Sequence, residues 1–228
     1  MKCFRETIKN LRNRLTAMPG DKHLEPPPWL YARLARGSLM RLIYRRFVAD
    51  LAGSLAPGTR LLDVGTGPGY LLGYLARDRP DLSLWGLDFS PDMIRRARQR
   101  AMAARWLVAD ACRLPFAAAV FDHVVASFSF HIWPCPEAGL LELRRVLAPG
   151  GRAWVYELRR EVSLQDLRAF ARETGLPFFL VHLGHKIVSR HHALPESEFA
   201  HLLHQAAGPR GTLQPAHHIF WRAELPPA

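Results

Sequence analysis

Two periodicities alternate along the middle of the chain. Short apolar runs are separated by longer segments in which apolar residues recur every three or four positions. The short runs predict β-strands and the longer segments predict amphipathic α-helices. Regular alternation of the two predicts a parallel sheet with helices on both faces. Strands are expected at residues 60–64, 82–87, 105–109, 121–126 and 151–156, and helices at 70–78, 91–103 and 136–147.

The two ends of the chain follow the pattern less closely. Residues 1–18 predict a short basic helix, and residues 29–51 predict further helix with an apolar residue at every fourth position. Residues 178–183 are compatible with a strand or a helix. The remaining expected elements are helices at 163–173 and 195–205 and a terminal strand at 217–222. We expect two parts, a basic helical arm and lid over residues 1–55 and a globular domain over 56–228.

Positive charge is concentrated in the N-terminal arm. The formal net charge is +11, and residues 1–50 hold eleven of the 31 basic residues but four of the 20 acidic ones. A basic arm favours an anionic partner, either a membrane surface or a nucleic acid. The preference of a high-GC genome for Arg, or simple solubility, explains the same excess, so these interpretations stay open.

Composition limits which cellular compartment and which class of protein we expect. A hydrophobic content of 49% over 228 residues is typical of one globular domain. The cysteines Cys3, Cys112 and Cys135 are odd in number and far apart, so we expect neither a disulfide framework nor a metal site. The N-terminus lacks the apolar core of a signal peptide, and no apolar run is long enough to cross a bilayer. A cytoplasmic protein is expected.

The most informative motif is the glycine-rich turn that follows the first predicted strand. Gly65, Gly67 and Gly69 alternate with other residues between that strand and the next predicted helix. Glycines at this spacing clear side chains from a strand-to-helix turn, so a ligand can lie against the backbone. Cofactors bind at such turns in doubly wound sheets.

An acid follows the second predicted strand. Asp88 lies 19 positions beyond Gly69, which is the spacing expected for a carboxylate that holds a ribose diol. A dinucleotide fingerprint requires Gly or Ala at the third small position, where this chain has Tyr70. The details therefore favour a cofactor other than NAD.

Five blocks in order resemble a known family. Residues 63–69 match its first motif and residues 86–94 its second, residues 109–116 and 121–126 match the third and fourth, and residues 144–152 match the turn before the fifth strand. In these blocks the chain resembles the class I S-adenosylmethionine-dependent methyltransferases, in particular the ubiquinone/menaquinone-biosynthesis branch. The resemblance implies a doubly wound, Rossmann-like α/β fold. Its seven-stranded, mostly parallel sheet would have an antiparallel last strand, and N-terminal helices would precede it.

The resemblance also assigns residues to the cofactor, S-adenosylmethionine. The three glycines would let its methionyl and ribose portions approach the backbone, and Asp63 would hold its ammonium group through water or neighbouring backbone. Asp88 would accept hydrogen bonds from both ribose hydroxyls, since a carboxylate has two acceptor oxygens. The further cofactor-binding residues predicted are Phe89, Met93, Asp110, Ala111, Ser127 and Tyr31. For Tyr31, Ala32 stands where the branch often has Asp, so packing explains it as well as a lid does.

Methyl transfer from a sulfonium needs alignment more than acid–base chemistry, because the leaving group departs as a neutral thioether. His131 follows the fourth predicted strand, where donor and acceptor would meet. An imidazole there could deprotonate a phenol, amine or thiol acceptor. Lining the pocket or capping a helix is the alternative role for His131.

Histidines are concentrated late in the chain, with eight of the eleven after residue 181. His201 and His204 would share a helix face, but no Cys, Asp or Glu joins them at a recognisable ligand spacing. We therefore expect surface and pocket histidines.

The sequence favours a methyltransferase acting on a small or lipid-like acceptor, peripheral to a membrane if the basic arm docks there. Two alternatives stay open: RNA methylation guided by the basic arm, and a regulatory subunit that binds the cofactor without turnover.

Overall fold

The computed structural model describes residues 38–100 and 103–228. The chain groups into two compact units, residues 1–41 and 42–228. Of the first unit, the described residues are 38–41, which begin helix α3 (Ser38–Ser54). The predicted helix at 1–18 and Tyr31 lie outside the described residues, and the predicted boundary between residues 55 and 56 stays a prediction.

Residues 42–228 are built on one mainly parallel sheet. Its strand order is β3-β2-β1-β4-β5-β8-β7, with β6 pairing with the end of β5. β8 runs antiparallel to β5 and pairs with β7, whereas β1 to β5 are parallel. The predicted fold class is confirmed. The strands are β1 (Arg60–Val64), β2 (Ser83–Asp88), β3 (Arg105–Val108), β4 (Phe121–Ser127), β5 (Leu147–Arg159), β6 (Ala193–Leu194), β7 (Thr212–Ala216) and β8 (Phe220–Leu225).

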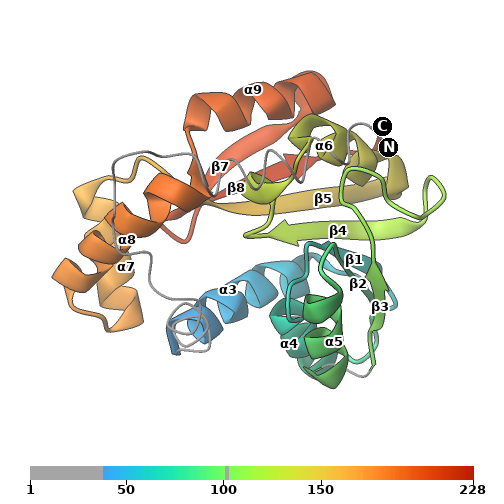
Figure 1. Cartoon of the computed structure of the whole chain (residues 1–228), viewed down its shortest axis with the longest axis horizontal. Coiled ribbons are helices and arrows are strands. Elements are labelled where there is room, and N and C mark those ends of the chain that lie inside the picture. Colours follow the sequence, from blue (N-terminus) through green and yellow to red (C-terminus); the bar gives the residue numbers. More distant parts are fainter. Residues whose placement is uncertain (1–37, 101–102) are drawn as a thin grey trace. The chain divides into compact units, whose positions relative to one another are not determined.

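Helices cover both faces of the sheet, as the alternation of periods predicts. Figure 1 shows α4 and α5 on one side of the sheet, and α6 and α9 together on the other. The apolar residues of β1 are buried, as expected for a central parallel strand covered on both faces. The helices after α3 are α4 (Tyr70–Asp78), α5 (Pro91–Arg100), α6 (Pro136–Val146), α7 (Leu164–Thr174), α8 (Phe178–His192) and α9 (Glu196–Ala207).

The predicted terminal strand at residues 217–222 is wrong at its start. Residues 217–219 form the loop of a hairpin, in which Ala216 of β7 pairs with Phe220 of β8. The hydrophobic pattern also predicted no strand at the position of β7. His217 and His218 adopt φ angles of 45° and 69°, the left-handed region that few residues other than glycine occupy. Residues 178–183, compatible with a strand or a helix, belong to α8.

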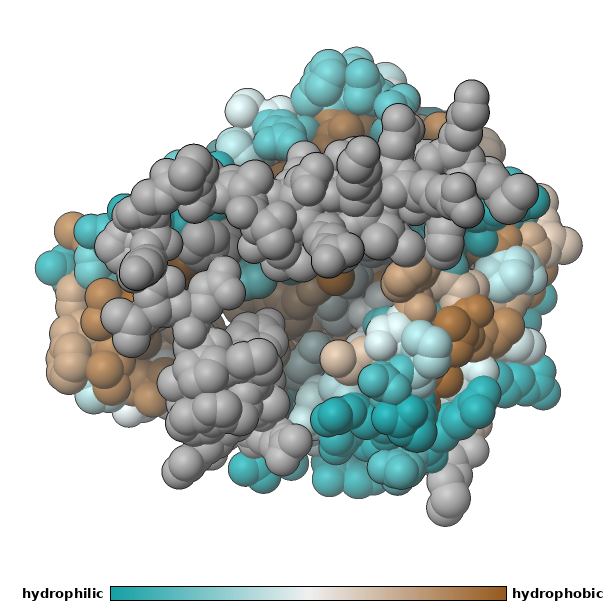
Figure 2. Space-filling view, in the orientation of Figure 1, coloured by the Kyte–Doolittle hydropathy of each residue, from teal (hydrophilic) through white to brown (hydrophobic). Residues whose placement is uncertain are grey.

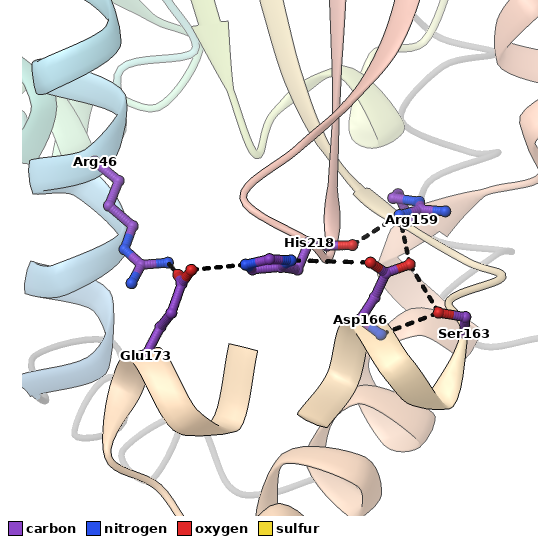
Figure 3. Close-up of polar contacts among 6 residues, drawn as sticks. All are labelled: Arg46, Arg159, Ser163, Asp166, Glu173 and His218. Atoms are coloured by element: carbon purple, nitrogen blue, oxygen red, sulfur yellow. Dashed lines mark hydrogen bonds and ion pairs between the residues drawn. The ribbon is translucent and has the colours of Figure 1, made fainter. Parts of the chain in front are cut away.

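Polar contacts hold the two histidines in that loop. Figure 3 shows Arg46 of α3 paired with Glu173 of α7 at 2.5 Å, and the same carboxylate accepting a hydrogen bond from His218 at 2.8 Å. Asp166 of α7 lies 3.8 Å from the His218 ring and 3.4 Å from Arg159 at the end of β5. These contacts connect the hairpin to α3, α7 and β5, and they offset the cost of the left-handed backbone.

Asp50 of α3 makes the matching contacts with the first histidine. Its carboxylate is 2.9 Å from His217, accepts a hydrogen bond from the Tyr156 hydroxyl at 3.1 Å, and lies 3.8 Å from Arg222. Burial raises the pKa of Asp50, but the hydrogen bonds with His217 and Tyr156 and the electrostatic interactions with His217 and Arg222 outweigh burial and hold the pKa below its usual range. The carboxylate therefore ties α3 to the sheet.

We expect Asp50→Asn to lower the free energy of unfolding by roughly 1–3 kcal/mol near neutral pH, because it weakens hydrogen bonds to a charged acceptor. The folded-state pKa is lowered, so this stabilisation is present above the unfolded pKa of about 3.9 and is lost as pH falls through the folded value. Urea denaturation of both proteins over a pH series should show the gap closing at acid pH. Asp78→Asn, at an exposed pair with Arg77, is the control and should change little. A gap independent of pH would contradict this account.

Candidate functional site

The parallel register brings the predicted cofactor residues to one edge of the sheet. Asp63 lies near the carboxyl end of β1, Asp88 ends β2, Asp110 follows β3 by two residues, and Ser127 ends β4. The pairing of β1 with both β2 and β4 places β1 at the centre of this group. Ligands of open α/β sheets bind at this edge, outside the carboxyl ends of the strands.

Asp88 is fixed against the glycine-rich turn. One carboxylate oxygen accepts a hydrogen bond from the Gly67 backbone N–H at 2.8 Å, and the other accepts one from the Ser90 N–H at 2.8 Å. Burial raises the pKa of Asp88, although these two donors oppose the rise. Each oxygen keeps a further lone pair. The carboxylate is therefore held in place and can still accept from a diol.

The three glycines of the turn have different reasons to be glycine, and all have positive φ. A Cβ on Gly65 would lie 2.4 Å from the Ser129 side chain, and one on Gly69 would lie 2.8 Å from the Trp106 ring. A Cβ on Gly67 would meet nothing within 4 Å. Packing within the protein accounts for two of the glycines, and Gly67 is the one that leaves space open for a ligand.

Asp63 is fully buried below this turn. Its Oδ2 accepts a hydrogen bond from the Thr66 hydroxyl at 2.6 Å, and its Oδ1 has no hydrogen-bond partner within the described part of the chain. Burial raises the pKa of Asp63 to about 7, the charge of Asp88 adds to the rise, and the Thr66 bond opposes it. A buried acceptor without a partner is the arrangement that a cationic ligand group would relieve.

Of the residues predicted to contact the adenine, Phe89 follows β2, Met93 lies in the first turn of α5, and Asp110 and Ala111 follow β3. Phe89 and Met93 are exposed, at 59% and 38% of their surfaces, so both offer apolar surface to a ligand. Asp110 accepts a hydrogen bond from the Cys112 N–H at 2.8 Å, which shapes the turn after β3, and Ala111 is buried. These positions are compatible with a planar base lying on Phe89, and the roles stay predictions.

His131 lies in a short 3-10 turn, η1 (Phe130–Ile132), just after β4. Its Nδ1 is 3.0 Å from Oε2 of Glu157, a residue of β5 that is 1% exposed. The other Glu157 oxygen accepts the Phe130 N–H at 2.7 Å, which fixes the carboxylate. The Nε2 of His131 lies 3.2 Å from Nδ1 of His192, the last residue of α8. A carboxylate and two imidazoles thus form a continuous hydrogen-bonded chain.

The backbone next to these hydrogen-bonded side chains is strained. Phe128, between β4 and η1, has a φ of 56°, which is rare for an aromatic residue. Its ring packs on the rings of Phe47 of α3 and Phe220 of β8, with centroids 5.4 Å and 5.3 Å away, so the surrounding side chains hold the backbone conformation. Strained residues maintained in this way are frequent next to functional sites. Ser127, the neighbouring predicted residue, is buried.

The sequence pattern did not predict two residues of this hydrogen-bonded chain, Glu157 and His192. Glu157 stands alone as an acid within the apolar strand β5, which was a usable signal, because a buried charge needs a partner. His192 was one of the eight late histidines, and its contact with His131 depends on how α8 packs. Over residues 38–100 and 103–228, no cluster of three or more His, Cys, Asp or Glu side chains is placed to hold a metal ion. His201 and His204 both lie on α9.

Comparison with known proteins identifies the class. Residues 61–151 match a family described as a methyltransferase domain. A demethylmenaquinone methyltransferase from Thermus thermophilus is 43% identical over 120 residues, which are 51% of this chain and 54% of that protein. A ubiquinone/menaquinone biosynthesis C-methyltransferase UbiE from Desulfotalea psychrophila is 32% identical over 163 residues, 70% of this chain and 62% of that one. The chain carries a class I S-adenosylmethionine-dependent methyltransferase domain.

Within that class the chain is similar, over part of its length, to methyltransferases of ubiquinone and menaquinone biosynthesis. It spans about half the length of the curated relatives it matches. Solved structures agree in fold: the plantazolicin methyltransferase BpumL, in complex with SAH, has a TM-score of 0.65 at 17% identity over 98% of this chain and 96% of that one. A methyltransferase from Aquifex aeolicus has a TM-score of 0.58 at 20% identity over 78% and 87% of the two chains. At these identities the likeness shows the fold.

The buried carboxyl group gives a test of the site without any ligand. The folded-state pKa of Asp63, about 7, lies above the unfolded value of about 3.9. Its contribution to stability is therefore full below the unfolded pKa and is lost as pH rises through the folded one. Asp63→Asn removes this titration, so the variant should not lose this stability as pH rises. We expect the difference in free energy of unfolding, variant minus wild type, to be about 2–3 kcal/mol larger at about pH 8 than at about pH 5. Urea denaturation at both pH values measures this, and an unchanged difference would show that Asp63 is not the buried titrating group.

Proposed function

We propose that this protein binds S-adenosylmethionine at the glycine-rich edge of its sheet and transfers the methyl group to a small or lipid-like acceptor. The observation that carries the proposal is the hydrogen-bonded chain from Glu157 through His131 to His192, built beside the strand end where the cofactor residues gather. A non-catalytic binding subunit would need no imidazole oriented by a buried carboxylate.

The residues present fit the cofactor. Asp88, already fixed against the loop, would accept the two ribose hydroxyls, and the open side of Gly67 would leave room for the ligand next to the backbone. The Asp63 carboxylate would balance the ammonium group, through water or neighbouring backbone, and its unpartnered oxygen supports that role. Phe89 and Met93 offer exposed apolar surface for the adenine.

Bound S-adenosylmethionine supplies an electrophilic methyl group on a sulfonium. Held at this edge, the cofactor would supply that methyl group for in-line displacement by the acceptor atom, and the electron pair of the broken carbon–sulfur bond would stay on sulfur. Because the departing thioether is neutral, no protein acid is needed on that side. The protein must align the acceptor, exclude water and, where the acceptor carries a proton, remove it.

In this proposal His131 removes that proton. The Glu157 carboxylate can only accept, so it selects the tautomer of His131 with the proton on Nδ1, which leaves the lone pair on Nε2. Nε2 therefore serves as the base, and His192 Nδ1 donates to it while no acceptor is bound. Glu157 then stabilises the imidazolium that forms. In this arrangement Glu157 is a positioning residue, since it acts through His131.

The names of the relatives suggest the class of acceptor. Several are demethylmenaquinone methyltransferases, whose named substrate is a quinone with a lipid tail. The match to the first of them covers 54% of its length, so we carry over the acceptor class and leave the acceptor atom open. Reduced demethylmenaquinone is accordingly the first acceptor to test.

Asp88→Ala should weaken binding of S-adenosylhomocysteine about tenfold or more, because charge-assisted hydrogen bonds worth roughly 1.5–3 kcal/mol are lost. Isothermal titration calorimetry measures the effect, with circular dichroism to show that the variant is folded. Asp78→Ala, an exposed acid at the end of α4, is the matched control and should bind as the wild type does. Micromolar binding of NAD, with no response to S-adenosylhomocysteine, would contradict the cofactor assignment.

His131→Ala should reduce turnover by roughly 10²–10⁴ while S-adenosylhomocysteine affinity is retained. The assay is transfer of label from methyl-tritiated S-adenosylmethionine to reduced demethylmenaquinone. Glu157→Gln should also lower kcat, and it should alter the pH profile of kcat by disturbing the His131 tautomer, which simple destabilisation would not do. His204→Ala, at an exposed position on α9, is the control. Full turnover by His131→Ala would remove His131 from the mechanism.

A further inference from the structure

Helix α8 turns an apolar face outward. Phe179, Leu183 and Ile187 follow one another at four-residue spacing, so they lie along one side of the helix. They are 66%, 54% and 49% exposed, and Leu180 and Val188 are exposed as well. Val181 and Ser189 are buried on the opposite side. Figure 2 shows apolar surface gathered at the left edge, over α7 and α8. A contiguous apolar stripe of this kind on a protein surface indicates an interaction site.

Basic side chains border this stripe. Lys186 and Arg190 lie on the exposed side of α8, and the helix contains no Asp or Glu. Arg168 and Arg172 of α7 line a neighbouring depression of about 510 Å³. Within the described part of the chain, none of these four side chains forms an ion pair with a carboxylate. The surface is therefore apolar at its centre and positively charged around it.

The two acidic residues of α7 that flank Arg168 and Arg172 are already engaged. Asp166 and Glu173 of α7 contact the His218 side of the domain, together with Arg159 and Arg46 respectively (Figure 3). They are therefore held by other cations. The positive charge bordering the stripe is left for a partner to balance.

We propose that this face, the outward side of α8 with Arg168 and Arg172 of α7, docks on an anionic lipid bilayer. An exposed apolar stripe with flanking Lys and Arg is the pattern of a helix that lies in a bilayer interface, where the apolar residues enter the acyl boundary and the cations meet anionic headgroups. Within the described residues, no helix is long and apolar enough to cross a membrane, so the contact would be along the surface. This docking site is separate from the basic arm, whose first 37 residues lie outside the described part of the chain.

A second copy of the chain fits this face less well. In a two-fold contact the same surface meets itself, so Lys186 and Arg190 would face the equivalent cations of the other copy. No acid on α8 is available to balance them. Charge complementarity therefore favours anionic headgroups.

The location of this face connects docking with the reaction. The last residue of α8, His192, contacts His131, so the helix that would lie on the bilayer ends at the proposed base. A lipid-like acceptor could then reach the site from the membrane without crossing water. In this respect the inference rests on the proposed function, whereas docking itself does not require it.

Sedimentation with vesicles tests the docking. The full chain is mixed with vesicles of phosphatidylglycerol and phosphatidylcholine in equal parts, or of phosphatidylcholine alone, at low and at physiological ionic strength. The wild type should partition to the anionic vesicles, and less strongly at higher salt. The double variant L183E/I187E should lower the partition coefficient roughly tenfold or more. K186E/R190E should lower it to a similar extent, about tenfold, on the anionic vesicles alone. L141E, at an apolar residue of α6 that is 47% exposed, is the matched control and should leave binding unchanged.

Three outcomes would overturn the proposal. These are absence of binding to anionic vesicles at low salt, binding by L183E/I187E equal to that of the wild type, and a dimer of the wild type, seen by light scattering, that L183E/I187E converts to a monomer. Calorimetry with S-adenosylhomocysteine, without vesicles, separates this proposal from the proposed function. All variants should bind this ligand as the wild type does. Vesicle docking without ligand binding would refute the proposed function and leave the docking site standing.

Discussion

The parallel register of β2, β1 and β4 is the constraint on which the rest of the site depends. Because these strands run the same way and lie side by side, Asp88, the glycine-rich turn and the segment carrying His131 all emerge at one edge. The hydrogen bond from the Gly67 N–H to Asp88 then fixes the loop after β1 to the end of β2 across the sheet edge. These groups are far apart in the sequence, and without that register they would not meet in one site.

Several features of this edge cost stability and are maintained by their surroundings. The Asp63 carboxyl group is fully buried with one oxygen unpartnered, Glu157 is buried within the sheet, and Phe128 has a left-handed backbone. Burial of a carboxyl group is unfavourable for its charged form, and left-handed backbone is unfavourable for an aromatic residue. Proteins keep such features chiefly where a site needs preformed geometry. Their concentration near the ends of β1, β4 and β5 supports a functional site at this edge.

The central elements could be predicted from the sequence because their signals are local. Helix α4 and strand β1 begin and end where the periodicity of the chain placed them. The hairpin at His217 could not be predicted in this way, because its backbone is held by contacts with Asp50 and Glu173, far away in the sequence. The role of His192 could not be predicted for the same reason, since it depends on how α8 packs next to His131. For Glu157 the sequence offers a local signal, an acid within an apolar strand, but its partner becomes known only when β5 packs beside His131. Local pattern thus identified the cofactor motifs, whereas the proposed proton path depends on tertiary contacts.

The most direct measurement is a crystal structure of the protein with S-adenosylhomocysteine. The account predicts that the ribose hydroxyls lie within hydrogen-bonding distance of the Asp88 carboxylate, that the adenine lies against Phe89, and that the sulfur points towards the His131 side of the sheet edge. Ligand density elsewhere in the molecule, or a ribose away from Asp88, would contradict the central claim that this edge is a methyltransferase cofactor site.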